Sequence, residues 1–226
     1  MTMPFYVAPE QVMKDRADYA RKGIARGRSL AGLIYNDGVL ICAENQSRSL
    51  HKVSEIYDHI AFAGVGRYNE FDSLRTAGVR LADLRGYSYS REDVDARSLA
   101  NAYAQTLGQV FTHEMKPMEV EILVAELGVD DHPDQLFHIL YDGTVVDEEN
   151  FTVLGGEAET IAERLKKGFS EGMELGTALR AAVSALAGPE RTFTAKDLEV
   201  AHLARSNGRR AFKRIVDGEL EQLLAG

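Results

Sequence analysis

The sequence lacks the residues on which several classes of protein depend. It has one cysteine, Cys42, in 226 residues, which excludes an internal disulfide and most cysteine-based metal sites. Its five prolines are scattered, so no proline-rich linker divides the chain. No window is apolar enough to span a bilayer, and the N-terminus lacks the cationic start and apolar core of a signal peptide. We therefore expect a cytoplasmic protein that does not act on a membrane.

Positive charge is also scarce. Lysine and arginine total 26 against 35 aspartates and glutamates, which gives a net charge of −9. Because an acidic chain repels phosphate backbones, nucleic-acid binding is disfavoured as the main task. Hydrophobic residues make up 45% and charged residues 27%, the composition of a globular protein. With no linker and no internal repeat, the prediction is a single domain over residues 1–226.

The patterns of metal sites, cofactor sites and paired catalytic acids are missing as well. The six histidines show neither a helical pair nor ligand spacing, so no metal site is predicted. Gly64-Val65-Gly66 lacks the third glycine of a dinucleotide fingerprint, and no cofactor is predicted. Cys42 lies between apolar residues, which predicts a buried, inert thiol. Glu119, Glu121 and Glu126 alternate with apolar residues, and this pattern favours the solvated side of a strand.

The first element expected is a helix over about residues 9–25. Proline suits the first helical position, so Pro9 predicts the start, and Glu10 favours the positive end of the helix dipole. Gly27 is expected to end the helix. Its apolar positions are few, which predicts a helix on a surface or an interface rather than in a core.

Strands and helix pairs alternate along the rest of the chain. Asp-Gly turns at residues 37–38 and 142–143 predict antiparallel hairpins, and apolar residues at intervals of three to four predict helices. The expected strands cover residues 30–35, 39–43, 55–63, 120–127, 136–141, 144–146, 198–204 and 211–216. The expected helices cover residues 69–84, 94–114, 157–169, 177–186 and 219–224. Because each helix pair needs a sheet face to cover its apolar stripe, the order predicts an α+β fold, a four-layer αββα sandwich of two antiparallel sheets between helix layers.

Short motifs spread over nearly the whole chain carry a family resemblance. They are Asp18-Tyr19-Ala20, Ala25-Arg26-Gly27, Asn36-Asp37-Gly38-Val39-Leu40, Ser49-Leu50-His51-Lys52-Val53, Gly64-Val65-Gly66-Arg67-Tyr68-Asn69-Glu70-Phe71-Asp72 and Leu99-Ala100-Asn101-Ala102-Tyr103-Ala104-Gln105. In order and spacing they resemble a proteasome core-particle α subunit of the actinobacterial type. The family fold is the αββα sandwich of N-terminal-nucleophile hydrolases, in agreement with the periodicity.

The resemblance implies that this chain is not itself catalytic. In the related β subunits the nucleophile is the hydroxyl of an N-terminal threonine, activated by its own α-amino group. Setting Asp37-Gly38-Val39 against the matching β-type hairpin places Arg28 at the threonine position, with Glu44 and Lys52 at supporting positions. Arginine cannot act as that nucleophile, so we interpret the supporting residues as remnants of ancestry. The alternative is an N-terminal-nucleophile hydrolase activated by cleavage before Ser29.

The resemblance also implies a gate at the N-terminus. In the family, the segment that precedes the first helix converges on the ring axis and closes the entrance pore. The expected gate lies in residues 1–8 and consists of Thr2, Met3, Pro4, Phe5, Tyr6, Val7 and Ala8. A frayed terminus is the alternative.

An activator-docking site is expected at Lys52, with Gly27, Gly66 and Arg67. In α subunits the matching lysine lies between neighbouring subunits and pairs with the terminal carboxylate of an activating ATPase, a recurring mode of recognition. The two glycines would let a peptide tail approach, and Arg67 would add a second cation. An ordinary solvated lysine is the alternative.

The function implied is that of a non-catalytic subunit in the outer ring of a compartmentalised protease. Its expected partners are other α subunits in a seven-membered ring, proteasome β subunits, the C-terminal tails of a ring-shaped AAA ATPase activator, and protein substrates in transit. In actinobacteria the family is linked to degradation of proteins tagged with the small protein Pup. A free-standing binding protein that shares only the fold is a further alternative, because fold does not determine function.

Overall fold

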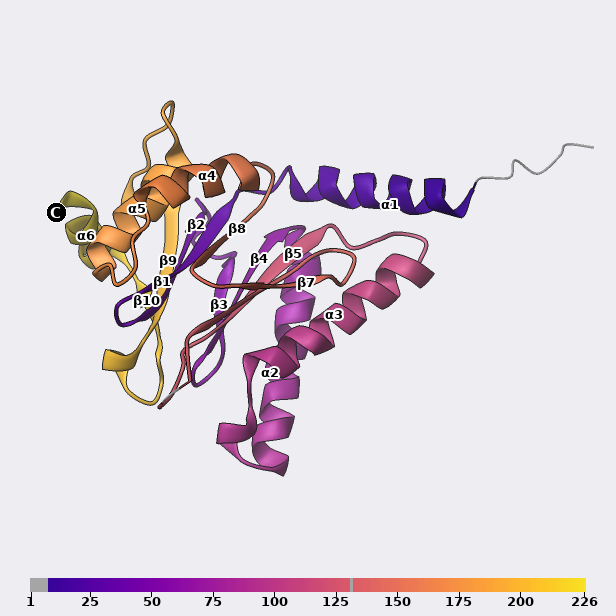
Figure 1. The fold of residues 1–226 in the computed structure, drawn as a ribbon, viewed down its shortest axis with the longest axis horizontal. Helices are drawn as coiled ribbons and strands as arrows, with labels where there is room; N and C mark the ends of the chain where they lie inside the picture. The colour runs from indigo at the N-terminus through magenta and orange to yellow at the C-terminus, as the bar shows by residue number, and fades with distance from the viewer. Residues whose placement is uncertain (1–7, 131) are drawn as a thin grey trace, which may run out of the picture.

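The computed structural model describes residues 8–130 and 132–226, in which two five-stranded antiparallel sheets lie face to face (Figure 1). The first sheet has the order β10-β9-β2-β1-β8, with β1 (Leu30–Tyr35), β2 (Gly38–Glu44), β8 (Phe151–Leu154), β9 (Leu198–Ala204) and β10 (Phe212–Ile215). The second has the order β3-β4-β5-β6-β7, with β3 (Val53–Tyr57), β4 (Ile60–Gly66), β5 (Val120–Glu126), β6 (Gln135–Ile139) and β7 (Val145–Glu148).

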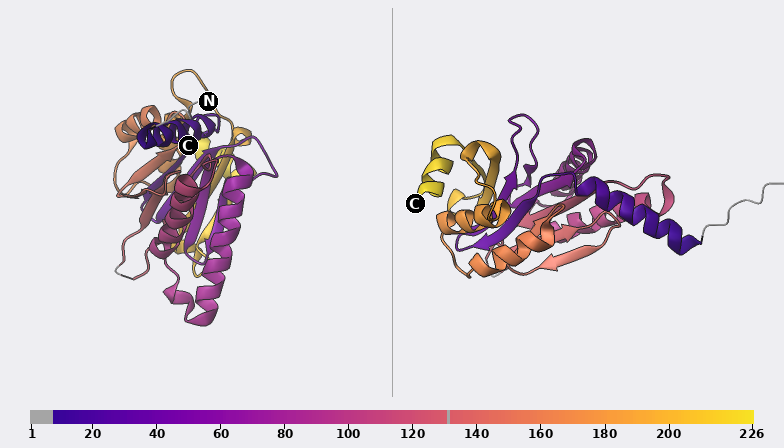
Figure 2. Two further views of the ribbon diagram at one scale, coloured as in Figure 1. Left: turned by 90° about the vertical axis from the view of Figure 1, so that its right-hand side faces the viewer. Right: turned by 90° about the horizontal axis from the view of Figure 1, so that it is seen from above.

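Helices cover the outer face of each sheet (Figures 1 and 2). The helices α4 (Ala158–Gly168) and α5 (Leu175–Ala187) pack on the first sheet, and α2 (Tyr68–Ser88) and α3 (Ala96–His113) pack on the second. The last helix, α6 (Asp217–Ala225), lies beside α5. The αββα sandwich predicted from the sequence is confirmed. Among the described helices, none is both long and apolar enough to cross a bilayer.

Strand β2 shows how the sequence pattern builds a core on both sides of a sheet. Val39 and Ile41 pack between the two sheets, whereas Leu40 and Cys42 pack under α4 and α5. Because side chains alternate across a strand, a strand that is apolar at every position must be covered on both faces. The buried position predicted for Cys42 is confirmed, and burial raises the pKa of its thiol to about 12.

Two strand predictions need correction. Residues 55–63, expected as one strand, belong to two antiparallel strands, β3 and β4, that meet at a turn over Asp58 and His59. This turn has neither glycine nor proline, and Asp58 alone is too weak a turn signal to divide the segment. Strand β8 was not predicted, because its four residues are too few to show alternation. It forms at the sheet edge, where Leu154 pairs with Leu30 of β1.

The first helix, α1 (Pro9–Ile24), projects from the body of the molecule (Figures 1 and 2). Its buried residues, Ala20, Gly23 and Ile24, all lie in the last two turns. Val12, Met13 and Tyr19 are exposed by 40–47%. The helix is therefore anchored at its C-terminal end and through Arg16, which bonds to the carbonyl oxygens of Val110 and Glu114 at the end of α3, in agreement with the prediction of a surface or interface helix.

Candidate docking site at the start of β1

Arg28, Glu44 and Lys52 come together at the start of β1, as the hairpin alignment predicts. Arg28 lies two residues before the start of β1, and its guanidinium forms an ion pair with Glu44. Glu44 ends β2, where its N–H donates to the carbonyl oxygen of Ser29 at 3.1 Å. Lys52 directly precedes β3, and its Nζ donates to the carbonyl oxygen of Arg28 at 2.5 Å. Three segments thus bring two cations and one carboxylate to the corner of the sandwich.

A fourth residue, Arg191, completes this group and was missed by the sequence analysis. The Glu44 side chain is only 6% exposed, and Nη1 of Arg191 lies 3.1 Å from its Oε2. A buried carboxylate must be paired to remain charged, and Glu44 has a guanidinium on each oxygen. Arg191 is 147 positions away in sequence, in the segment that follows α5, so no local pattern indicates this contact.

Lys52 differs from the two arginines because its ammonium has no carboxylate partner among the described residues. Its side chain is partly buried and bonds to a neutral carbonyl oxygen. Burial lowers the pKa of Lys52 to about 8, while the carboxylates of Glu44 and Glu199 favour its charged form. An ammonium that has lost part of its hydration gains from an additional carboxylate, so this position can receive an anionic group.

Gly27 and Gly66 lie against each other beside this group. A Cβ atom on Gly27 would lie 2.9 Å from the backbone nitrogen of Gly66, and a Cβ on Gly66 would lie 1.9 Å from the carbonyl oxygen of Glu119. Gly66 also has a φ of +98°, a conformation that favours glycine. Gly27 therefore allows the segment after α1 to pack closely against the end of β4, and Gly66 allows β4 to pack closely against Glu119, which directly precedes β5. Their role as a wall for a peptide tail stays a prediction.

Arg67, predicted as a second docking cation, is already paired. Its Nη1 lies 3.2 Å from Oε2 of Glu119 and 3.8 Å from Oε1 of Glu70. The ammonium of Lys116 lies 2.8 Å from the same Glu119 oxygen and 3.0 Å from Oε1 of Glu70. An incoming anion would have to compete with two carboxylates for Arg67. The docking role of this residue remains a prediction with a weaker physical basis than that of Lys52.

All three glutamates expected on a solvated strand face are at least partly buried, and Glu121, with a side chain 14% exposed, lies 3.3 Å from Nε2 of His138. Glu119 is buried, because α1 covers it at Gly23, where a Cβ would lie 2.1 Å from the Glu119 carboxylate. Glu126 is partly buried and accepts the N–H of Ala96 at the start of α3, at 2.9 Å. Burial raises the pKa of Glu126 above its ordinary value. Positions 119 and 126 differ in parity, so the two side chains lie on opposite faces of the sheet: α1 covers Glu119 and the start of α3 covers Glu126.

The remaining predicted sites lie at the N-terminus and at Ser29. Thr2 to Val7 are outside the described residues, and Ala8 is exposed and precedes α1, with its carbonyl oxygen accepting the N–H of Gln11 at 2.9 Å. Ser29 is buried and begins the pairing between β1 and β2. The described part of the chain holds no group of three or more His, Cys, Asp or Glu side chains placed to hold a metal ion.

The fold and this site define a class of protein: a two-sheet αββα sandwich of the N-terminal-nucleophile hydrolase type, with Arg28, Glu44 and Lys52 brought together at the start of β1. Residues 24–203 match the family model described as proteasome subunit. The α subunit of the Acidimicrobium ferrooxidans proteasome is 62% identical over 99% of this chain and 97% of its own length. Those of Sanguibacter keddieii and Thermomonospora curvata are 58% and 57% identical over all of this chain and 90% and 99% of their own lengths.

The chain belongs to the proteasome subunit family, and within it to the α subunits of the actinobacterial type. Such subunits are not catalytic, and the active sites of the complex lie on β subunits. The alternative of a hydrolase freed by cleavage before Ser29 finds no support in these matches or in the buried position of that side chain.

Proposed function

We propose that this α subunit forms the seven-membered outer ring of a proteasome core particle as a single α-type domain. It stacks on a ring of β subunits, gates the entry of substrates and docks a ring-shaped AAA ATPase through the tails of that ATPase. The task is degradation of cytoplasmic proteins, linked to tagging with Pup by family resemblance. The single observation that carries the docking role is the Lys52 ammonium, which is charged at neutral pH and, within the described part of the chain, bonds to a carbonyl oxygen but to no carboxylate.

The arrangement of α1 supports a role in ring formation. The N-terminal half of the helix contacts little of its own subunit and leaves Val12 and Met13 exposed. An exposed apolar stripe on a projecting helix is stabilised when a neighbour covers it. A ring closes through such head-to-tail contacts between copies of one chain. The proposed gate, residues 1–8, directly precedes this helix in the sequence, so the position of α1 in the ring would determine where the gate begins.

The opposite end of the molecule supports a separate contact with β subunits. Figure 1 shows α1 and the connection between α2 and α3 at opposite ends of the subunit. Leu84, Tyr87 and Tyr89 at this connection are exposed by 62–90%. Exposed aromatic side chains are typical anchors of protein interfaces. Lys52 bonds to Arg28 in the segment that follows α1. An activator bound at Lys52 and β subunits bound at the connection between α2 and α3 would therefore occupy different surfaces of the ring.

The test uses particles assembled from β subunits and either the wild-type α chain or its Lys52→Ala variant. Stimulation of peptide hydrolysis by the ATPase is expressed relative to the basal rate of each particle. We expect Lys52→Ala to abolish this stimulation, and the matched control Lys167→Ala, at an exposed lysine of α4, to retain it. Stimulation of the Lys52→Ala particle to the wild-type level would show that Lys52 is an ordinary surface lysine.

A further inference from the structure

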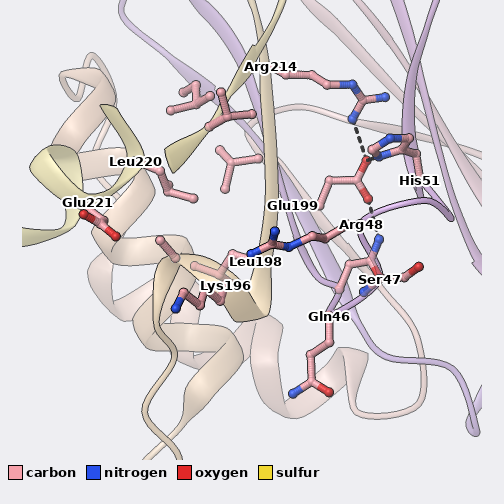
Figure 3. A pocket seen from close by; sticks show the side chains of 15 residues that line it. Gln46, Ser47, Arg48, His51, Lys196, Leu198, Glu199, Arg214, Leu220 and Glu221 are labelled. Carbon is pink, nitrogen blue, oxygen red and sulfur yellow. Dashed lines mark hydrogen bonds and ion pairs between the residues drawn. The ribbon is translucent and has the colours of Figure 1, made fainter. Parts of the chain in front are cut away.

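Glu199 is a nearly buried carboxylate that none of the roles above uses. It is the second residue of β9, between Leu198 and Val200, whose side chains pack under α4 and α5. Because side chains alternate across a strand, Glu199 points to the other face, toward the second sheet. Its side chain is 9% exposed. Figure 3 shows the carboxylate directed toward Arg214 and His51.

The carboxylate of Glu199 binds both ends of the segment that leads into Lys52. At the first end, Nδ2 of Asn45 donates to Oε2 at 2.7 Å. At the other end, the backbone N–H of Lys52 donates to Oε2 at 2.8 Å and that of Val53 donates to Oε1 at 3.2 Å. One side chain therefore closes residues 45–53 into a loop of fixed shape.

Two further groups complete the surroundings of this carboxylate. Nη1 of Arg214, from β10, lies 2.6 Å from Oε1, and Nδ1 of His51 lies 3.2 Å from the same oxygen. The guanidinium keeps the carboxylate charged in spite of its burial. Glu199 thus connects the edge of the first sheet to the loop that carries Lys52.

These contacts fix the position of the Lys52 backbone. Its N–H is held by Glu199, and its carbonyl oxygen accepts the N–H of Gly64 at 3.1 Å. A lysine side chain has several rotatable bonds, so the position of its ammonium depends on a fixed backbone. With both backbone groups held, the side chain reaches the carbonyl oxygen of Arg28, where the ammonium is presented to a ligand.

We propose that Glu199 is the positioning residue of the docking site: its carboxylate fixes the loop from Asn45 to Val53 and thereby places the Lys52 ammonium for the terminal carboxylate of an activator tail. This inference rests on the docking function proposed for Lys52. Glu199 does not touch the tail and acts through the backbone of Lys52.

The variant Glu199→Gln tests this role with almost no change of shape. Each oxygen of Glu199 accepts at least two N–H groups, so an amide in either orientation places its own NH₂ against donors. The matched control is Glu55→Gln on β3, because Glu55 forms a similar ion pair with Arg210 but does not contact residues 45–52.

The measurement is ATPase-stimulated peptide hydrolysis, relative to the basal rate of each particle, over a range of ATPase concentrations. We expect Glu199→Gln to raise the concentration for half-maximal stimulation by about tenfold, because hydrogen bonds to a charged group are lost, while the maximal stimulation is retained. Glu55→Gln is expected to match the wild type. A fluorescent peptide with the C-terminal sequence of the ATPase should show the same weakening, and its C-terminal amide should bind poorly to every variant.

The double variant separates positioning from general destabilisation. If Glu199 acts only through Lys52, Glu199→Gln added to Lys52→Ala weakens peptide binding no further than Lys52→Ala alone. Additive losses would overturn the inference, and so would a wild-type response of Glu199→Gln in particles that do require Lys52. A wild-type response of Lys52→Ala would instead overturn the docking function itself.

A second variant covers the case in which Glu199→Gln does not assemble. Asn45→Ala removes the donor to Glu199 together with the bonds of the same amide to Leu50 and Ser47, and it leaves the ion pair with Arg214 in place. We expect it to raise the half-maximal concentration by about threefold, less than Glu199→Gln, because Glu199 keeps its bonds to the N–H groups of Lys52 and Val53. An unchanged value would show that the loop does not need this anchor to position Lys52.

Discussion

Two groups of charged side chains lie on either side of the contact between Gly27 and Gly66, and they differ in their balance of charge. The first, which we name the Glu44 cluster, consists of Arg28, Glu44, Lys52 and Arg191. The second, the Glu119 cluster, consists of Arg67, Glu70, Lys116 and Glu119. In the Glu44 cluster, Arg28 and Arg191 share the buried Glu44 carboxylate, Arg191 also lies 3.8 Å from Glu157, and Lys52 pairs with no carboxylate of the described residues. In the Glu119 cluster, both cations face the same two carboxylates. Only the first cluster has positive charge to offer a ligand.

The comparison teaches that a cation is a candidate binding residue only when its surroundings leave it without a carboxylate. The sequence analysis made Lys52 the principal contact and Arg67 a second cation, and each is a basic residue next to the end of a strand. The Arg67 guanidinium is committed to Glu119 and Glu70, and that commitment anchors the end of α1 over Gly23. The Glu119 cluster is therefore structural, and the Glu44 cluster is the better candidate for docking.

The largest expected effect is a contrast between two alanine substitutions: Lys52→Ala should weaken docking without loss of stability, and Arg67→Ala should lower stability with little change in docking. Lys52→Ala should weaken binding of the tail peptide by roughly tenfold or more, because a charge-assisted hydrogen bond is lost. Its folding stability should not fall, since the lowered pKa means that folding disfavours the charged lysine. Arg67→Ala should change the affinity for the peptide by no more than about twofold, the small energy typical of exposed ion pairs. It should lower the melting temperature, because the ion pair between Arg67 and Glu119 is lost. Peptide titration and thermal unfolding of both variants measure the contrast.

An equal loss of peptide binding in both variants would place Arg67 in the docking site and remove the distinction between the clusters. Lys52→Arg sharpens the same comparison, because it keeps the charge but replaces the ammonium with a larger planar group. It should bind the peptide better than Lys52→Ala and less well than the wild type.

Sequence reasoning reached Arg28, Glu44 and Lys52 because all three lie within one hairpin and the segment after it. A turn at Asp37-Gly38 sets the pairing of β1 with β2, and that pairing alone brings Glu44 beside Ser29. Resemblance to the β-subunit pattern supplied the rest. The same reasoning gave the sandwich, because the helix pairs are long and strongly periodic.

Arg191 and Glu199 could not be found in this way. Arg191 bonds to Glu44 and Glu199 bonds to Lys52, and the partners of each bond are 147 positions apart in the sequence. A single sequence gives no indication of contacts at such a separation. Glu119 shows a different limit. Its alternation with apolar residues is real, but alternation does not reveal that α1, a mostly polar helix, covers that face.

The next effect tests the Glu119 cluster as a structural unit. Arg67→Met combined with Lys116→Met removes both cations and leaves Glu119 buried without a counter-charge. Breaking a buried pair from one side destabilises a protein by about 3–5 kcal/mol, and the partial exposure of both cations places the expected loss near 3 kcal/mol. Denaturant unfolding of the isolated α chain measures it. The single variant Glu119→Gln should lose less, because the cations left behind are hydrated. A loss below about 1 kcal/mol for the double variant, the level of surface ion pairs, would show that the cluster does not hold α1 in place.

A smaller effect concerns pH and should appear in the Glu44 cluster alone. The pKa of Lys52 is lowered from 10.5 to about 8, so the ammonium is charged at pH 7 and increasingly neutral above pH 8. A bound carboxylate favours the charged form, so binding above pH 8 requires uptake of a proton. Affinity for the tail peptide should then fall by up to about tenfold per pH unit above 8, equivalent to about 1.4 kcal/mol.

Folding stability changes with pH in the opposite sense. The charged lysine is disfavoured in the folded state below pH 8, and this penalty is relieved as the pH rises from 8 toward 10.5. The Lys52→Arg variant, whose guanidinium stays charged, should bind the peptide with little change between pH 7 and 9. The same steep fall in Lys52→Arg would assign the pH dependence to another group.

The smallest effect separates the two glycines between the clusters. In Gly27→Ala the new Cβ would lie 2.9 Å from the Gly66 nitrogen, so the two segments must move apart by a few tenths of an ångström. We expect a loss of about 1 kcal/mol, at the low end for overpacking a close contact. In Gly66→Ala the Cβ would lie 1.9 Å from a backbone oxygen, at a φ of +98°, and the loss should be clearly larger. Unfolding of both variants measures the difference. If Gly27→Ala instead preserves stability but weakens the tail peptide as much as Lys52→Ala does, the glycine is an open wall of the docking site, and the site extends from Lys52 toward the Glu119 cluster.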